Sequence, residues 1–330
     1  MTKRIEALDG IRGYAALSVA LGHSLLAVTG LALWSTDLHN FPAMSGSEIG
    51  LRLLSVVMPS DAAVMVFFVL SGHVLWHSFA RKNLSASGFI AYLRARIQRL
   101  YPLIIITTVT IGIVKHAALM SIISTALLWT VSVNGVLWSL QVEVIGSVVI
   151  VLIWFAAGRS QKRLALALLG TAVIVPLARG TPLVFMPAFV LGALINTVPD
   201  GIWRRKSIPL FGLCLLLSTN IIFGHGGITR IFEMAGATCL VGGMGRAPVG
   251  VLLNPVARFL GAISYPFYLS HPLGAIFAAA ILARIHDHLS SITKIAVFAL
   301  ISIGIAMPLA WILHITIEHP MIDRRRRQTA

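Results

Sequence analysis

Long apolar stretches are the feature of this 330-residue sequence that most constrains its fold. A helix that crosses a bilayer needs about 20 mostly apolar residues, and ten stretches approach that length. Only 11% of the residues are charged, whereas soluble domains carry about 25%, so the composition excludes a soluble globular protein and a disordered chain. We therefore predict an all-α, polytopic membrane bundle that forms a single domain over residues 1–330. The predicted spans are 9–33, 62–80, 100–117, 136–157, 164–179, 183–198, 207–224, 228–245, 259–283 and 294–317.

The distribution of the basic residues predicts how these helices are oriented. Cytoplasmic loops of membrane proteins carry an excess of Lys and Arg. With ten spans, the loops 81–99, 158–163 and 199–206 lie on the same side as both termini, including the basic tail 321–330, and the loops 34–61 and 284–293 lie on the opposite side. A crossing by the leftover apolar segment 118–133 would turn the later basic loops outward. We therefore expect both termini to be cytoplasmic and 118–133 to form a short re-entrant or interfacial helix.

Charge and cysteine content exclude other classes of protein. The net charge of +15 does not indicate nucleic-acid binding, because the basic residues occur in short clusters between apolar runs. Cys214 and Cys239 lie inside apolar runs and have neither disulfide nor metal-ligand spacing, so we predict no metal site. The apolar stretch at the N-terminus lacks a small-residue cleavage site, and we expect the first helix to be retained.

A few polar residues lie inside the predicted spans. An ionisable side chain near the bilayer centre costs at least about 2.5–3.5 kcal/mol, which makes such residues functional candidates. Counting along each span puts His23, Ser71, Glu143 and His271 at comparable depths in four different helices. We hypothesise that they meet. The competing interpretation is that each only bonds a neighbouring helix, and His73 is assigned to that structural class.

Cytoplasmic arginines form a second group. Arg96 and Arg99 are three residues apart and share one face of a helix, just before Pro102. Two planar guanidinium groups on one face suit a phosphate-bearing ligand. An orientation signal or an anchor for lipid headgroups is the alternative interpretation.

The first helix contains a further arginine, Arg12. Its spacing from Asp9 permits an ion pair within the helix. An ion pair does not require the adjacent Gly10 and Gly13, which allow close approach by another backbone or by a ligand.

These residues occur in spaced motifs that together extend over residues 4–320. The motifs, quoted by their positions here, are Arg4, Leu8, Asp9, Gly10, Arg12, Gly13, Ala15, Ala16, Val19 and His23; Phe67, Phe68, Ser71, Gly72 and Leu75; Arg96, Arg99 and Pro102; Trp138, Ser139, Leu140 and Glu143; Ile263, Ser264, Tyr265, Tyr268, Leu269 and His271; and Ile317, Glu318 and Pro320. In this pattern the sequence resembles the membrane acyltransferase-3 family.

The resemblance implies an acyltransferase of the bacterial inner membrane. Such an enzyme moves an acyl group, usually acetyl from cytoplasmic acetyl-CoA, to a hydroxyl of a carbohydrate, a surface polysaccharide or a lipid-linked sugar. Some relatives instead acylate small molecules such as macrolides, or amino groups. The implied partners are acyl-CoA as a co-substrate, the glycan acceptor and membrane lipids, with no bound cofactor and no nucleic acid. We expect no soluble serine-hydrolase-like extension.

Roles for individual residues follow from the resemblance and from the chemistry. A sugar hydroxyl needs a base within hydrogen-bonding reach, for which His23 is suited, and Glu143 is expected to orient its ring. Arg12, Arg96 and Arg99 are expected to bind acyl-CoA. Tyr268, His271 and Ser71 are candidate oxyanion or acceptor contacts, and Asp9, Gly10 and Trp138 support the motifs. Direct transfer and an acyl-enzyme on Ser71 or His23 both stay open.

A transporter or flippase is the rival class. It would also place ionisable residues at mid-membrane depth, with His23 and Glu143 as a proton relay. The sequence does not identify the acceptor, the acyl chain length or the oligomeric state.

Overall fold

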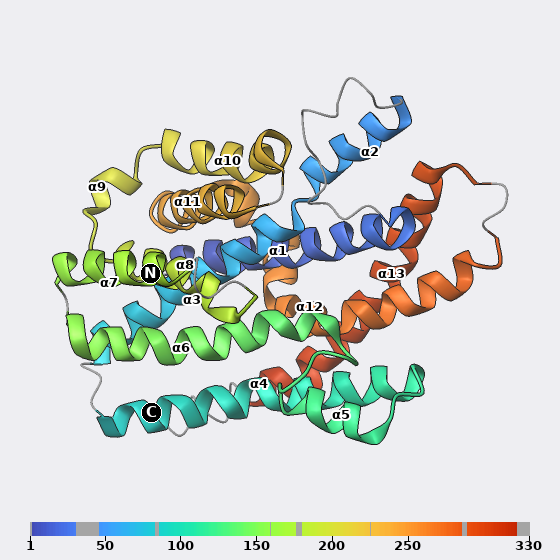
Figure 1. Cartoon of the computed structure of the whole chain (residues 1–330), viewed down its shortest axis with the longest axis horizontal. Coiled ribbons are helices and arrows are strands. Elements are labelled where there is room, and N and C mark those ends of the chain that lie inside the picture. Colours follow the sequence, from blue (N-terminus) through green and yellow to red (C-terminus); the bar gives the residue numbers. More distant parts are fainter. Residues whose placement is uncertain are drawn as a thin grey trace. The chain divides into compact units, whose positions relative to one another are not determined.

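Helices are the regular secondary structure of the residues that the structure describes. A computed structural model of the chain describes residues 2–30, 46–82, 86–158, 160–175, 180–224, 226–285 and 289–321, and this part contains no strand (Figure 1). Its elements are α1 (Thr2–Thr29), α2 (Gly46–Val57), α3 (Ser60–Lys82), α4 (Ala86–Val114), α5 (Leu119–Ala126), η3 (Gly135–Leu137), α6 (Trp138–Ala157), α7 (Gln161–Ile174), η4 (Pro182–Phe185), α8 (Met186–Leu194), α9 (Asp200–Trp203), α10 (Ser207–Phe223), α11 (Gly227–Met244), η5 (Gly250–Leu252), α12 (Pro255–Leu282), α13 (Ser291–Leu313) and η7 (His314–Glu318).

Six helical segments of the described chain are long and apolar enough to cross a membrane. They are Glu6–Thr29, Ile49–Ala80, Gly88–Val114, Gly135–Ala157, Pro255–Leu282 and Ser291–Met321. A helix also lies at each of the other four predicted spans, but these helices are shorter: α7 has 14 residues and rises about 21 Å, against about 30 Å of hydrocarbon. The all-helical membrane fold is confirmed, and the count of ten spans with cytoplasmic termini stays a prediction.

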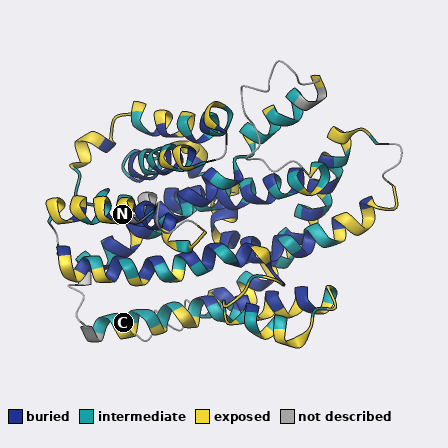
Figure 2. Cartoon of the chain, in the orientation of Figure 1, coloured by how far each residue is buried: buried dark blue, intermediate teal, exposed yellow. Residues whose placement is uncertain are grey.

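The segment 118–133 forms a short helix followed by a turn. Helix α5 has eight residues, a rise of about 12 Å, which is too short to cross the bilayer. Two side chains hold the backbone around it: Gln141 Nε2 donates to the Leu128 carbonyl at 2.7 Å, and Lys115 Nζ donates to the Val133 carbonyl at 2.9 Å. The segment is therefore a folded connection between longer helices, and Figure 2 shows exposed residues along α5.

The chain forms two compact units. Unit 1 comprises Met1–Asn83 and Val142–Gly261, and unit 2 comprises Leu84–Gln141 and Ala262–Ala330. Within unit 1, helix α3 packs against α1, α8 and α11, and α10 lies along α11 (Figure 1). Helix α3 is therefore the helix around which unit 1 is assembled.

Glycines allow the close contact between α3 and α8. A Cβ on Gly72 would collide with the carbonyl oxygen of Phe189, and a Cβ on Gly192 would collide with that of Val69. Asn196 Nδ2 adds a hydrogen bond of 3.1 Å to the His73 carbonyl. Lipid is as apolar as the side chains, so membrane helices associate through such close packing and interhelical hydrogen bonds. The contact fixes the segment of α3 that carries Ser71.

Aromatic side chains fill the interior of unit 1. The rings of Phe68 and Phe189 stack with centroids 5.4 Å apart, and Trp154 of α6 meets Trp76 edge-on at 4.9 Å. Phe79 approaches the same Trp154 ring at 6.3 Å. These contacts bring α6, which carries Glu143, against α3.

Unit 2 is built around α4 and α12. Tyr265 of α12 donates a hydrogen bond of 2.8 Å to the Leu100 carbonyl of α4. A buried cluster of Ile111, Val133 and Leu273 joins α4, the loop before α6 and α12, and Ile122 of α5 packs against it. The hydrogen bond from the buried Tyr265 therefore fixes the segment of α4 that carries Arg96 and Arg99.

Candidate functional site

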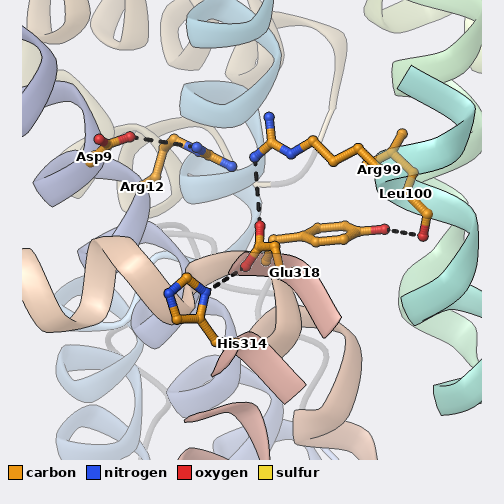
Figure 3. Close-up of polar contacts among 7 residues, drawn as sticks. Asp9, Arg12, Arg99, Leu100, His314 and Glu318 are labelled. Carbon is orange, nitrogen blue, oxygen red and sulfur yellow. Dashed lines mark hydrogen bonds and ion pairs between the residues drawn. The ribbon is translucent and has the colours of Figure 1, made fainter. Parts of the chain in front are cut away.

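Arg12 and His23 lie on the same face of α1. They are 11 residues apart, which is about three turns and a rise of about 16 Å. Arg12 Nη1 lies 3.6 Å from Asp9 Oδ1, so the predicted ion pair within the helix is present (Figure 3). The helix therefore carries a cation near its start and an imidazole three turns further along one face.

The two glycines beside Arg12 serve backbone packing. A Cβ on Gly10 would lie 2.6 Å from the Leu252 carbonyl oxygen, and a Cβ on Gly13 would lie 2.6 Å from the Gly261 nitrogen. The sequence left open whether these glycines face a backbone or a ligand. The structure places them against η5 and the start of α12, which fixes how the Arg12 turn is held in unit 1.

His23 is half-buried where α1 meets the beginning of α3. The preceding residue, Gly22, packs so closely that a Cβ there would lie 2.7 Å from Ser60 Cβ. The following residue, Ser24, is buried and donates to the Ala20 carbonyl at 2.9 Å. These two neighbours fix the backbone that carries the His23 ring.

Ser71 and Glu143 form the contact between α3 and α6. Ser71 Oγ donates a hydrogen bond of 3.2 Å to Glu143 Oε1. On the next turn of α6, Ser147 Oγ donates to the Glu143 carbonyl at 2.6 Å. The structure thus brings together two of the residues predicted from sequence.

The positions along α3 separate this contact from His23. Helices α1 and α3 run in opposite directions (Figure 1), and Ser60 marks the level of His23 on α3. Ser71 lies 11 residues beyond Ser60, about 16 Å further along the helix. The common depth predicted for His23 and Ser71 is not found, because α3 begins at the level of His23 and has Ser71 at its middle. The structure gives Glu143 the hydroxyl of Ser71 as a hydrogen-bonding partner, and the contact between Glu143 and the His23 ring stays a prediction.

In unit 2, Arg96 and Arg99 project from one continuous helix. Helix α4 runs through Pro102, so the arginine segment and the following span are a single element. Arg96 Nη1 donates to the Tyr92 hydroxyl at 2.9 Å, and Arg99 Nη2 lies 3.7 Å from Glu318 Oε1. The sequence predicted their shared face but gave neither partner.

Glu318 lies at the centre of a buried polar group. Its other carboxylate oxygen, Oε2, is 2.8 Å from His314 Nδ1, one turn earlier in the π-helical turn η7 (Figure 3). Sequence reasoning identified Glu318 only as part of a closing motif and passed over His314. The available signal was a carboxylate and an imidazole four residues apart at the end of an apolar helix.

The remaining candidates cluster where α12 meets the start of α6. His271 Nδ1 lies 2.9 Å from the Tyr268 carbonyl oxygen, and the Tyr268 hydroxyl lies 2.8 Å from Ser139 Oγ. A carbonyl only accepts hydrogen bonds, so the His271 Nδ1 carries the proton and a neutral ring has its lone pair on Nε2. The half-buried Trp138 precedes Ser139 at the first position of α6. This group is buried in unit 2, and Nε2 of a neutral His271 is a hydrogen-bond acceptor.

Comparison with known proteins supplies the family. No curated protein and no solved structure matches the chain. The family described as an acyltransferase domain matches residues 5–314, which is nearly the whole sequence and includes every catalytic and acyl-CoA-binding residue predicted above. The chain therefore belongs to the membrane acyltransferase-3 family and is an acyltransferase.

Proposed function

We propose that the protein transfers an acyl group, acetyl in the simplest case, from cytoplasmic acyl-CoA to a hydroxyl of a carbohydrate, surface polysaccharide or lipid-linked sugar. The observation that carries this proposal is the arrangement of α1, in which Arg12 and His23 share one face about three turns apart. A cation suited to phosphate and a base suited to a hydroxyl therefore lie about 16 Å apart on one face of α1. We place the enzyme in the bacterial inner membrane.

His23 acts as the general base in this proposal. Its ring takes the proton from the acceptor hydroxyl while that oxygen attacks the thioester carbonyl. The carbon–sulfur bond then breaks, and the coenzyme A thiolate leaves and takes up a proton. A positioned base contributes about 10²–10⁴-fold to such a step.

Ser71 and Glu143 act together on the acceptor in this proposal. Ser71 has one hydroxyl proton, and it points to the Glu143 carboxylate. The lone pairs of Ser71 then remain to accept a hydrogen bond from a sugar hydroxyl. We therefore assign this pair to acceptor binding and not to the oxyanion.

The arginines are assigned to the donor. Coenzyme A carries several phosphate groups, and Arg offers planar donors with a permanent charge. Arg12, Arg96 and Arg99 are the proposed phosphate contacts. Acyl-CoA is a co-substrate in this account, and no bound cofactor is required.

The test is acyl transfer by purified protein in lipid nanodiscs. Radiolabelled acetyl-CoA is supplied with surface glycan from the source cells, and both label in the glycan and released thiol are measured. Equal amounts of labelled glycan and thiol are expected. Thiol release without glycan label would contradict a carbohydrate acceptor, and binding of acetyl-CoA without either product would contradict the proposed reaction.

A further inference from the structure

The polar group around Glu318 has one exposed member, the arginine Arg99. The Glu318 side chain is only 4% exposed and that of His314 is 12% exposed, whereas Arg99 is 41% exposed. A buried carboxylate must be paired or hydrogen-bonded, and His314 Nδ1 meets this need at 2.8 Å. The second carboxylate oxygen faces Arg99 at 3.7 Å. The anchored member of the ion pair is thus the anion, and the accessible member is the cation.

A second arginine pair in unit 1 has the opposite arrangement. Arg246 is 7% exposed and donates to Asp200 Oδ1 at 2.9 Å and to the Ile195 carbonyl at 3.2 Å, while Asp200 is 59% exposed. There the cation is buried, and it ties the end of α11 to the α8–α9 connection. The guanidinium of Arg246 is buried and donates to two protein acceptors through Nε and Nη2, so that pair serves the fold. The Arg99 side chain is instead 41% exposed, so a ligand can reach it.

The local backbone supports a special role for the Glu318 turn. The helix α13 changes to a π-helical turn over His314–Glu318, and α4 contacts this turn. Single π-helical turns are rare and are frequently found at functional sites. On α4, the Tyr265 hydroxyl holds the Leu100 carbonyl, the residue after Arg99. Both the backbone of the arginine and its carboxylate partner are therefore fixed within unit 2.

We propose that His314 and Glu318 are positioning residues that hold the Arg99 guanidinium ready for a phosphate of the acyl donor. Arg carries five N–H donors, so it can face Glu318 with one edge and a phosphate with another. Holding the long side chain in place lowers the ordering cost that the ligand would otherwise meet. This inference rests on the proposed use of acyl-CoA and adds two residues that act through Arg99.

The experiment measures coenzyme A affinity by calorimetry with full-length protein in nanodiscs of neutral lipid. Glu318→Gln keeps the shape of the side chain and removes its charge. We expect the dissociation constant for coenzyme A to rise three- to tenfold. The KM for acetyl-CoA should rise by the same factor, and kcat should change less than twofold. These are order-of-magnitude values for the loss of about one charged contact.

A double-mutant cycle separates positioning from a structural role. If Glu318 acts through Arg99, then Arg99→Ala/Glu318→Gln binds coenzyme A no more weakly than Arg99→Ala alone. His314→Asn retains a donor near the position of Nδ1 and should bind more tightly than His314→Leu. The matched control is Glu6→Gln, which makes the same change opposite Arg258 in an exposed pair of 3.3 Å and should leave the affinity unchanged.

Several outcomes would overturn the inference. If the losses of coenzyme A affinity multiply in the double mutant, Glu318 acts independently of Arg99. If Glu318→Gln binds coenzyme A more tightly than the wild type, the Glu318 carboxylate competes with the phosphate for Arg99. Unchanged coenzyme A affinity with lost binding to phosphatidylglycerol vesicles would assign Arg99 to lipid headgroups. If Glu318→Gln does not fold, the coenzyme A affinity of His314→Leu is measured instead, and an unchanged affinity would contradict the inference. Failure of the wild type to bind acetyl-CoA would instead contradict the proposed function.

Discussion

Ser71 donates its hydroxyl proton to Glu143 across the contact between α3 and α6, at a distance of 3.2 Å between Oγ and Oε1. The two residues come from separate motifs and are separated by 72 positions in the chain. Gly72, the neighbour of Ser71, packs on α8 and sets the position of the serine. The hydrogen bond therefore connects the second and fourth motifs of the sequence into one polar contact.

The first prediction concerns this contact. Ser71→Ala removes the hydroxyl that we assign to the acceptor and should raise the acceptor KM about tenfold, the scale of one lost hydrogen bond with an unpaired partner. Adding Glu143→Gln should cause no further loss, because both residues act through one hydroxyl. Initial rates at varied acceptor concentration measure both. Full activity of Ser71→Ala together with an inactive Glu143→Gln would give Glu143 a role of its own.

The second prediction concerns the packing of α3 on α8. Gly72→Ala adds a methyl group that meets the Phe189 carbonyl, and overpacking of this kind costs about 1–3 kcal/mol. The melting temperature of the detergent-solubilised protein should fall. Gly170→Ala in α7 is the matched control, since no atom lies within 4 Å of the added Cβ, and it should be neutral or slightly stabilising. Equal melting temperatures for both variants would contradict the close contact.

The third prediction concerns the donor. Arg99→Ala should weaken acetyl-CoA binding about tenfold or more, and Arg99→Lys should restore little, because an ammonium lacks the planar donor pair. Arg94 is exposed on the same helix, so Arg94→Ala serves as the control and should retain affinity. Calorimetry on the three variants makes the comparison. Equal losses for Arg94→Ala and Arg99→Ala would reduce the arginines of α4 to a general positive charge.

The fourth prediction concerns topology. With Cys214 and Cys239 replaced by serine, Gly46→Cys should react with an impermeant maleimide from the outside, and Gln161→Cys should react only after the membrane is opened. The basic loop at 158–163 and the positive-inside rule are the reasons. Reaction of both cysteines from the same side would exclude the ten-span arrangement.

Apolar runs in the sequence were sufficient to locate the helices, but not to establish their lengths. The run at 100–117 predicted a span, yet α4 begins at Ala86, because good helix formers around Arg94 and Arg96 extend it and Pro102 is accommodated inside it. The four segments between 164 and 245 form helices as predicted. Helix α7 begins at Gln161, before the predicted start, and ends at Ile174; residues 176–179 of the predicted span lie outside the described residues.

The contacts within the candidate site could not be predicted from the sequence, and the roles of its residues stay predictions. Motifs selected Arg12, His23, Ser71 and Glu143, but counting residues along a span gives one coordinate, and it does not show where a neighbouring helix begins or which side chains meet. The Arg99–Glu318 contact joins helices far apart in the chain, and no local periodicity reports such a pairing. The sequence did not indicate a role for His314, because its contact with the Glu318 carboxylate forms within a π-helical turn that the sequence pattern does not predict.

The central claim is that His23 is the base for acyl transfer, and mass spectrometry of surface glycan from cells tests it most directly. Cells that produce the wild-type protein should carry acylated glycan, and cells with equal amounts of His23→Ala should lose at least about 10²-fold of that acylation while the purified variant still binds acetyl-CoA. Acylation by His23→Ala at the wild-type level would contradict the account and would direct the search for the base to His271.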